Sequence, residues 1–102
     1  KVVEALLIHG ANIHDTLSDG STALIYAAQN GHLSIVKILL DHGANVWEKT
    51  EEGMTSLILA SLYGRKQVVR LILDRGGAGM IYEANMHGET ALICAAKSGH
   101  EV

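Results

Sequence analysis

Two stretches of the chain share one pattern of hydrophobic and polar positions. Residues 20–45 read GSTALIYAAQNGHLSIVKILLDHGAN, and residues 53–77, which lie 33 positions later, read GMTSLILASLYGRKQVVRLILDRGG. Each begins with a glycine and a threonine, continues with a short apolar run to another glycine, and then carries a second apolar run. A fixed period of this size is the signature of a repeat protein.

The pattern predicts two helices in each unit. In the first copy we expect one helix at about residues 23–30 and a second at about 33–41. Thr22 is placed to cap the first helix, because its hydroxyl can accept a hydrogen bond from an N–H of the first turn. Gly31 stands between the helices, where the chain must turn in the left-handed conformation that glycine adopts at little cost.

The second helix of the unit cannot be covered by one partner. It is apolar on nearly every side, with Leu33, Val36 and Leu39 among its residues. Such a helix needs neighbours on both flanks. A single unit should therefore be unstable and a stack of units stable, which predicts a solenoid.

The motif resembles the ankyrin repeat. It reads Gly-x-Thr-x-Leu-x-x-Ala-Ala-x-x-Gly-His, followed by an apolar helix and Gly-Ala-Asn, and the resemblance covers the whole chain. It implies an all-α repeat solenoid of stacked ankyrin helix-loop-helix units joined by β-hairpin fingers. One departure is that Ile25, Ile58 and Ile93 replace the family's usual histidine, so packing should replace a polar link between units.

The repeat register divides the chain into four parts. We expect the second half of a repeat at 1–16, a complete repeat at 17–49, a repeat with a two-residue insertion at 50–84 and an incomplete repeat at 85–102. We expect the two inserted residues in the loop or the finger that follows the second helix, and the glycines of residues 76–79 predict that this finger is irregular. Neither end resembles a polar capping unit, so we expect neighbouring repeats of the same chain at both ends.

Composition restricts the class of partner and the cellular location that we expect. The formal net charge is −3 and no run of Lys or Arg occurs, which disfavours nucleic acid as the partner. The single cysteine, Cys94, permits no internal disulfide. No signal peptide or run long enough for membrane insertion is visible, so we expect a cytoplasmic protein.

No residue pattern indicates catalysis, a cofactor or a metal. The serines occupy positions that the repeat already explains, without a base and an acid in triad arrangement. His32 and His100 share one repeat position and His9 and His42 share another, which indicates structural roles. His14 and His87 have no ligand-type neighbours in sequence. The glycines of 76–79 lack the Lys-Ser/Thr of a phosphate-binding loop, and we expect Cys94 to be a buried apolar residue.

The resemblance also implies a partner-binding surface on the finger tips and the exposed flank of the first helices. Its charges are mainly acidic and its apolar residues could serve as anchors, which suits a basic amphipathic segment of a protein partner. Alternatives are plain solvated fingers, a structural spacer, or an intramolecular regulatory segment of a larger enzyme or channel. Trp47, where the family usually has a small polar residue, is a second contact candidate unless it packs under a finger. The residues expected at the surface are Asp19, Ser21, Glu51, Glu52, Met54, Leu62, Tyr63, Met86, His87 and Glu89.

Overall fold

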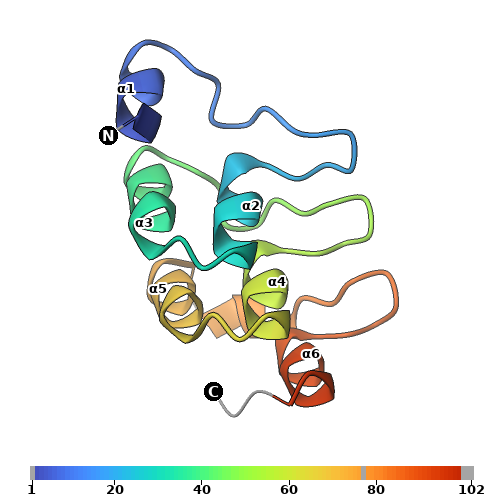
Figure 1. Ribbon diagram of the computed structural model, residues 1–102. Coiled ribbons are helices and arrows are strands. Elements are labelled where there is room, and N and C mark those ends of the chain that lie inside the picture. Colours follow the sequence, from blue (N-terminus) through green and yellow to red (C-terminus); the bar gives the residue numbers. More distant parts are fainter. Residues whose placement is uncertain (1, 77, 100–102) are drawn as a thin grey trace.

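The computed structural model describes residues 2–76 and 78–99 as a stack of helical units. Its helices form two layers, with α1, α3 and α5 in one layer and α2, α4 and α6 in the other, and the connecting fingers project from the second layer (Figure 1). The stack measures 40 × 26 × 21 Å, which is elongated as a solenoid should be. The elements are α1 Val2–Ile8, α2 Ala23–Gln29, α3 Leu33–Asp41, α4 Ser56–Leu62, α5 Lys66–Gly76, the 3₁₀ helix η1 Ala78–Tyr82, and α6 Ala91–Lys97.

The predicted helix signals are confirmed. Thr22 Oγ1 accepts a hydrogen bond from the N–H of Ile25 at 3.3 Å, and Thr55 and Thr90 make the same bond at the start of α4 and α6. Gly31 has a φ of +74°, the left-handed conformation expected between α2 and α3. The same residue types therefore begin and end the helices in each unit.

The core runs through the stack between the two layers. α4 lies between α2 and α6, and six of its seven residues are buried. In α3 the buried residues are Val36 and Leu39. Ile25 and Ile58 are both fully buried, so apolar packing fills the position where the family usually has histidine.

The fingers are simpler than full β-hairpins. Among the described residues, the finger before α4 has one antiparallel bridge, between Lys49 and Thr55, and the finger before α6 has one between Ala84 and Thr90. Both fingers also make the same turn: Gly53 N–H donates to Thr50 O, and Gly88 N–H donates to Asn85 O, each at 2.9 Å. The described part of the chain is therefore all-α, with no extended sheet.

The finger that follows the two inserted residues keeps the regular turn, so the expected irregularity does not lie in the finger itself. α5 is two residues longer than α3, and η1 follows it where the first copy has no helix. The chain reaches the next finger in register, because Asn85 N–H donates to Glu89 O just as Thr50 N–H donates to Met54 O. Helical backbone absorbed the insertion since Met80, on η1, is fully buried against the core.

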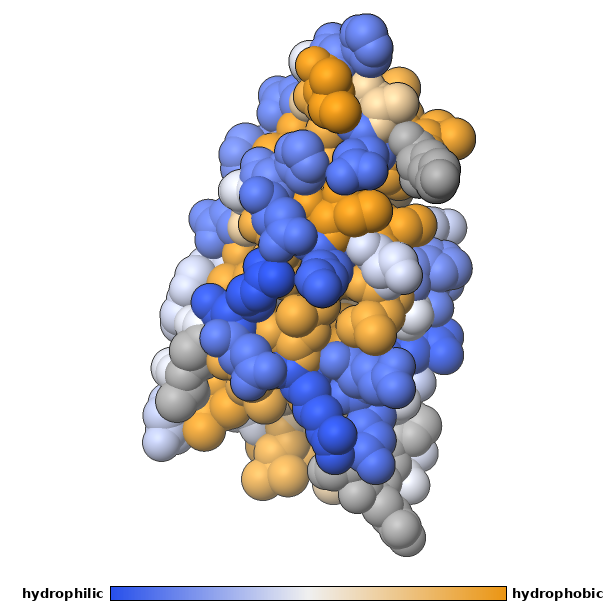
Figure 2. Space-filling view, turned by 90° about the vertical axis from the view of Figure 1, so that its left-hand side faces the viewer, coloured by the Kyte–Doolittle hydropathy of each residue, from blue (hydrophilic) through white to orange (hydrophobic). Residues whose placement is uncertain are grey.

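The outer face of α1, α3 and α5 is mixed in polarity. Hydrophilic residues form a band across this face, and hydrophobic residues lie on both sides of the band (Figure 2). α1 has no buried residue, and Val2 and Leu6 are 75% and 57% exposed. The expected second helix of the last unit, together with His100, lies outside the described residues.

Candidate functional site

Backbone contacts hold the finger tips in line. Glu51 N–H donates to Asp19 O at 3.0 Å, and Met86 N–H donates to Glu52 O at 2.8 Å. Gly20 has a φ of +87°, and a Cβ there would lie 3.2 Å from Thr50 Cα, so glycine serves both the backbone conformation and the close approach. The backbone positions that carry the acidic side chains at successive tips are thereby fixed relative to one another.

A hollow of about 410 Å³ lies between the finger before α2 and the finger before α4, and we name it the acidic hollow. Six of the predicted surface residues line it: Asp19, Ser21, Glu51, Glu52, Met54 and Tyr63. Gln29, Thr50 and Leu59 complete the lining. Thr50 and Leu59 were not predicted, because Thr50 precedes the finger tip and Leu59 has the apolar character of a core residue.

The lining of the acidic hollow combines negative charge with apolar surface. It contains three carboxylates and no Lys or Arg side chain. Glu51 and Glu52 are exposed, and Asp19 Oδ1 accepts a hydrogen bond from Ser21 N–H at 2.9 Å. That bond lowers the pKa of Asp19, so this carboxylate is ionised at neutral pH. Tyr63 is 46% exposed, and its ring adds aromatic surface to the lining.

Two of the six lining residues are less accessible to a partner than the sequence predicted. Ser21 is only 8% exposed, so its side chain offers a partner little surface. Met54 is half-buried and its sulfur accepts a hydrogen bond from Asn85 Nδ2 at 3.3 Å, which ties it to the next finger. Asp19, Glu51, Glu52 and Tyr63 are therefore the accessible members of the set.

The other four predicted residues lie outside the acidic hollow. Leu62 is half-buried on α4, and Met86 and His87 are exposed on the last finger. Glu89 is half-buried, accepts a hydrogen bond from Asn85 Nδ2 at 3.0 Å and forms an ion pair with Lys97. The hydrogen bond from Asn85 has the larger effect, and together with the contact to Lys97 it lowers the pKa of Glu89. Because Lys97 offsets its charge, the last finger adds little to the negative potential.

Cys94 and His14, which the sequence also raised as candidates, lie in surroundings that suit a structural role. Cys94 is 2% exposed, and burial followed by the nearby Glu89 charge raises the pKa of its thiol, which disfavours the reactive thiolate. His14 Nδ1 lies 3.0 Å from Glu48 Oε2, a pairing that sequence spacing did not show. Within residues 2–76 and 78–99, no three or more His, Cys, Asp or Glu side chains cluster in a way that suits a metal ion.

Trp47 lies against η1. It is 43% exposed, and a Cβ at Gly79 would be 3.5 Å from its Cη2 atom. It does not line the acidic hollow. Part of its ring therefore packs on the inserted 3₁₀ helix, and the rest faces solvent.

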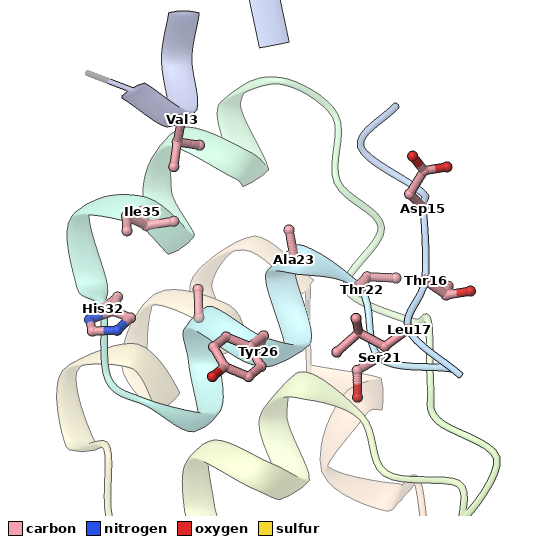
Figure 3. A pocket seen from close by; sticks show the side chains of 11 residues that line it. Val3, Asp15, Thr16, Leu17, Ser21, Thr22, Ala23, Tyr26, His32 and Ile35 are labelled. Atoms are coloured by element: carbon pink, nitrogen blue, oxygen red, sulfur yellow. The ribbon is translucent and has the colours of Figure 1, made fainter. Parts of the chain in front are cut away.

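A larger hollow, of about 700 Å³, lies at the other end of the second unit. Its walls include Val3 of α1, Ile35 of α3 and Leu17 of the first finger, with α2 between them (Figure 3). This hollow was not predicted, because the residues that line it are regular repeat positions. We name it the end slot.

Comparison with known families explains the arrangement. A family model of ankyrin repeats, built on three copies, matches residues 1–80 and residues 49–102. These overlapping matches extend over the whole chain. The chain belongs to the ankyrin-repeat family. Ankyrin repeats generally act in protein–protein interaction and are typically non-catalytic. The comparison with curated proteins gave no match.

The helices of this ankyrin stack are short. α5, with 11 residues, is the longest of the described helices. A bilayer-spanning helix needs about 20 apolar residues. Within residues 2–76 and 78–99, none of the helices is long and apolar enough to cross a membrane.

Proposed function

We propose that this ankyrin stack is a non-catalytic module that binds a basic amphipathic segment of a partner protein in the acidic hollow. The observation that carries the proposal is the convergence of Asp19, Glu51 and Glu52 around the exposed ring of Tyr63. A cationic side chain of the partner would face the carboxylates while an apolar side chain contacts the ring.

Charge favours a basic partner over an acidic one. Glu51 and Glu52 are exposed, and the ion pairs formed among residues 2–76 and 78–99 do not include them. Arg65 does not line the hollow, and its Nε donates to the backbone oxygen of Gln29 at 3.0 Å. Unpaired carboxylates attract cations over about 8–10 Å at moderate salt, so they should steer a basic segment toward the hollow.

The backbone of the two fingers is already ordered, which favours binding without rearrangement. The hydrogen bond from Glu51 N–H to Asp19 O joins the two fingers that form the hollow. Thr50 Oγ1 also accepts a hydrogen bond from Met54 N–H at 3.1 Å, which fixes the turn of the finger before α4. A surface that is already ordered loses less conformational entropy when a partner docks.

The test is a charge reversal in the hollow. The wild-type chain and the double variant Glu51→Lys/Glu52→Lys would each be used to capture partners from native extract. A captured protein would then be titrated against both at about 50 mM and about 500 mM salt. We expect the variant to bind at least about tenfold more weakly at low salt, with a much smaller difference at high salt. Tyr63→Ala should weaken binding at both salt concentrations, since it removes an apolar contact.

The matched control reverses two charges elsewhere. Glu4 and Asp74 are exposed on α1 and α5, in the layer opposite the fingers, and Glu4→Lys/Asp74→Lys changes the net charge by the same amount. This control should bind like the wild type. Equal binding by the wild type and the hollow variant at both salt concentrations would contradict the proposal and favour a spacer or an intramolecular segment.

A further inference from the structure

The turn between α4 and α5 differs in charge from the turn between α2 and α3. After Gly31, the α2–α3 turn continues with His32 and Leu33, whereas the α4–α5 turn has Arg65 and Lys66 at the corresponding positions. Leu33 is half-buried, but Lys66 is exposed. The exchange therefore places two permanent positive charges where the other copy of the repeat has none.

A hollow of about 380 Å³ lies between these two turns, and we name it the basic hollow. Its charged lining residues are Arg65 and Lys66, and no Asp or Glu side chain lines it. The hollow is formed by two repeats that pack on each other, α2 on α4 and α3 on α5. The remaining lining residues are Asn30, Gly31, Leu33, Gln67 and Val68.

The Arg65 side chain is held across the α2–α3 turn. Its Nε donates a hydrogen bond to Gln29 O at 3.0 Å. A Cβ at Gly31 would lie 2.9 Å from Arg65 Cδ, so the glycine leaves room for the arginine stem. Within residues 2–76 and 78–99, the two Nη groups of Arg65 form no hydrogen bond or ion pair. Their N–H donors are therefore available to a ligand.

Two further cations extend the positive charge from the basic hollow along the second helices. Lys37 lies one turn after Leu33 on α3, and Arg70 lies one turn after Lys66 on α5. Residues four apart share a face of a helix, and both cations are exposed. Among the described contacts, none of the ion pairs involves Lys37, Lys66 or Arg70. These charges are therefore not neutralised by a neighbour.

The acids of the second helices lie away from the basic hollow. The hollow is at the start of α3 and α5, whereas Asp41 ends α3 and Asp74 is close to the end of α5. Asp41 also pairs with Arg75, with Oδ1 2.9 Å from Nη2. The length of α3 is about 12 Å at 1.5 Å per residue, which exceeds the screening length of about 8 Å at physiological salt. The hollow therefore keeps a positive potential.

The chemistry of the basic hollow suits carboxylate side chains of a protein. The planar guanidinium of Arg65 can bind both oxygens of a carboxylate, and Lys66 adds a charge on a flexible stem. No aromatic side chain lines the hollow, so it lacks the ring on which a nucleic-acid base would stack. Leu33 supplies apolar surface for the stem of an acidic side chain. An acidic peptide segment fits this combination better than a nucleic acid.

We propose that the basic hollow is a second docking site, which binds an acidic segment of a partner protein. Arg65 holds one carboxylate of the segment, while Lys66 and Arg70 attract its neighbouring negative charges. The basic hollow and the acidic hollow share no lining residue. The second site therefore does not depend on the function proposed above, and either site can fail its test without the other.

The test is fluorescence anisotropy with a labelled octaglutamate peptide, titrated with the 102-residue chain at about 50 mM and about 500 mM salt. The variant Arg65→His/Lys66→Leu has the residues of the α2–α3 turn, so it should fold. At a pH of about 8 the new histidine is neutral. We expect the variant to bind at least about tenfold more weakly at low salt, with a smaller difference at high salt.

A second variant and a matched control separate this site from general charge. Arg65→Gln/Lys66→Gln should show the same loss, and both positions are exposed. The control Lys49→Gln/Lys97→Gln changes the net charge by the same amount at exposed positions outside the basic hollow. It should bind octaglutamate within about twofold of the wild type, because its charges are screened from the site.

Two further measurements locate the peptide and define its class. In amide NMR spectra, octaglutamate should shift Gly31 and Gln67, which line the basic hollow, and leave Gly53 on the finger unchanged. A single-stranded oligonucleotide of equal charge should bind more weakly than the peptide. The proposal would be overturned by a wild-type chain that does not bind octaglutamate at about 1 mM, by variants that bind like the wild type, by a control that loses as much, by shifts confined to the fingers, or by tighter binding of the oligonucleotide.

Discussion

At the scale of single residues, a few side chains fix the backbone that carries the surface. The Asp19 carboxylate accepts a hydrogen bond from the N–H of Ser21 and so shapes the turn at the edge of the acidic hollow. Thr22 then caps α2 directly behind that turn. The turn that holds the Asp19 carboxylate therefore leads directly into the capped start of α2.

Asp19 should contribute stability that depends on pH. Its pKa is lowered in the folded chain by the hydrogen bond from Ser21 N–H, so its contribution is fully present above its unfolded pKa of about 3.9. The contribution is lost as the pH falls through the lower folded value. We expect Asp19→Asn to unfold at less urea than the wild type at neutral pH, with the difference vanishing in strong acid. Urea unfolding followed by circular dichroism at both pH values would measure this.

The control for that experiment is Asp15→Asn. Asp15 is an exposed finger residue, and its carboxylate is not among the hydrogen-bond acceptors of the described contacts. Its replacement should leave the urea midpoint close to that of the wild type at each pH. A difference between the wild type and Asp19→Asn that persists unchanged in acid would show that the charge of Asp19 is not the cause.

At the scale of elements, α5 and η1 show how the repeat accommodates extra residues. α5 extends to Gly76, and η1 returns the chain to the core with Met80 fully buried. Gly76 is packed so closely that a Cβ there would overlap the sulfur of Met80 and lie 3.0 Å from Val46 Cγ2. The glycine serves close packing here, because its φ is not in the left-handed region.

Gly76→Ala should therefore destabilise the chain although alanine favours helix. Met80 is fully buried and has little room to move, so we expect a loss of about 1–3 kcal/mol in the free energy of unfolding. Gly79→Ala is the matched control, because its Cβ would meet only Trp47, at 3.5 Å or more. It should change stability by less than about 0.5 kcal/mol. Equal urea midpoints for Gly76→Ala and the control would contradict the packing described.

The second helix of the complete unit should carry much of the stability. Leu39 on α3 is 1% exposed, and Leu39→Ala should cost about 2–5 kcal/mol because it removes buried methyl groups and leaves a cavity. Lys37→Ala changes an exposed residue of the same helix and should cost less than about 0.5 kcal/mol. Chemical denaturation of the two variants measures the difference, and a negligible loss for Leu39→Ala would be inconsistent with its burial.

At the scale of the whole molecule, burial is greatest in the middle of the stack and least at its start. α4 is covered on both flanks by α2 and α6, whereas α1 makes few contacts and has no buried residue. Each unit contacts only its neighbours, as in other solenoids. Stability should therefore vary along the chain.

Hydrogen exchange should show this gradient. We expect the amides of α4 to be the most protected and those of α1 to exchange within the earliest time points, because local opening of α1 exposes little apolar surface. Hydrogen exchange of the chain at low concentration, followed by mass spectrometry, would test this expectation. Uniform protection of α1 and α4 would mean that the stack opens only as one unit.

Much of the fold could be read from particular residues. Thr22 and Gly31 marked the ends of α2 because capping and left-handed turns depend on local backbone chemistry. Six of the ten surface residues meet in the acidic hollow because finger position is set by the repeat. The burial of Ser21 and the pairing of Glu89 with Lys97 were not predicted, since both depend on neighbouring side chains.

The sequence by itself determined the period, the helices and their stacking, because each depends on local propensity and on an apolar pattern that one unit cannot bury. Only the tertiary structure decided where the two inserted residues went, since burial of Met80 favoured a longer helix and a 3₁₀ turn over an irregular finger. The tertiary structure also decided which parts of the surface form hollows. The acidic hollow and the end slot both arise from contacts between units, and those contacts join residues more than 30 positions apart.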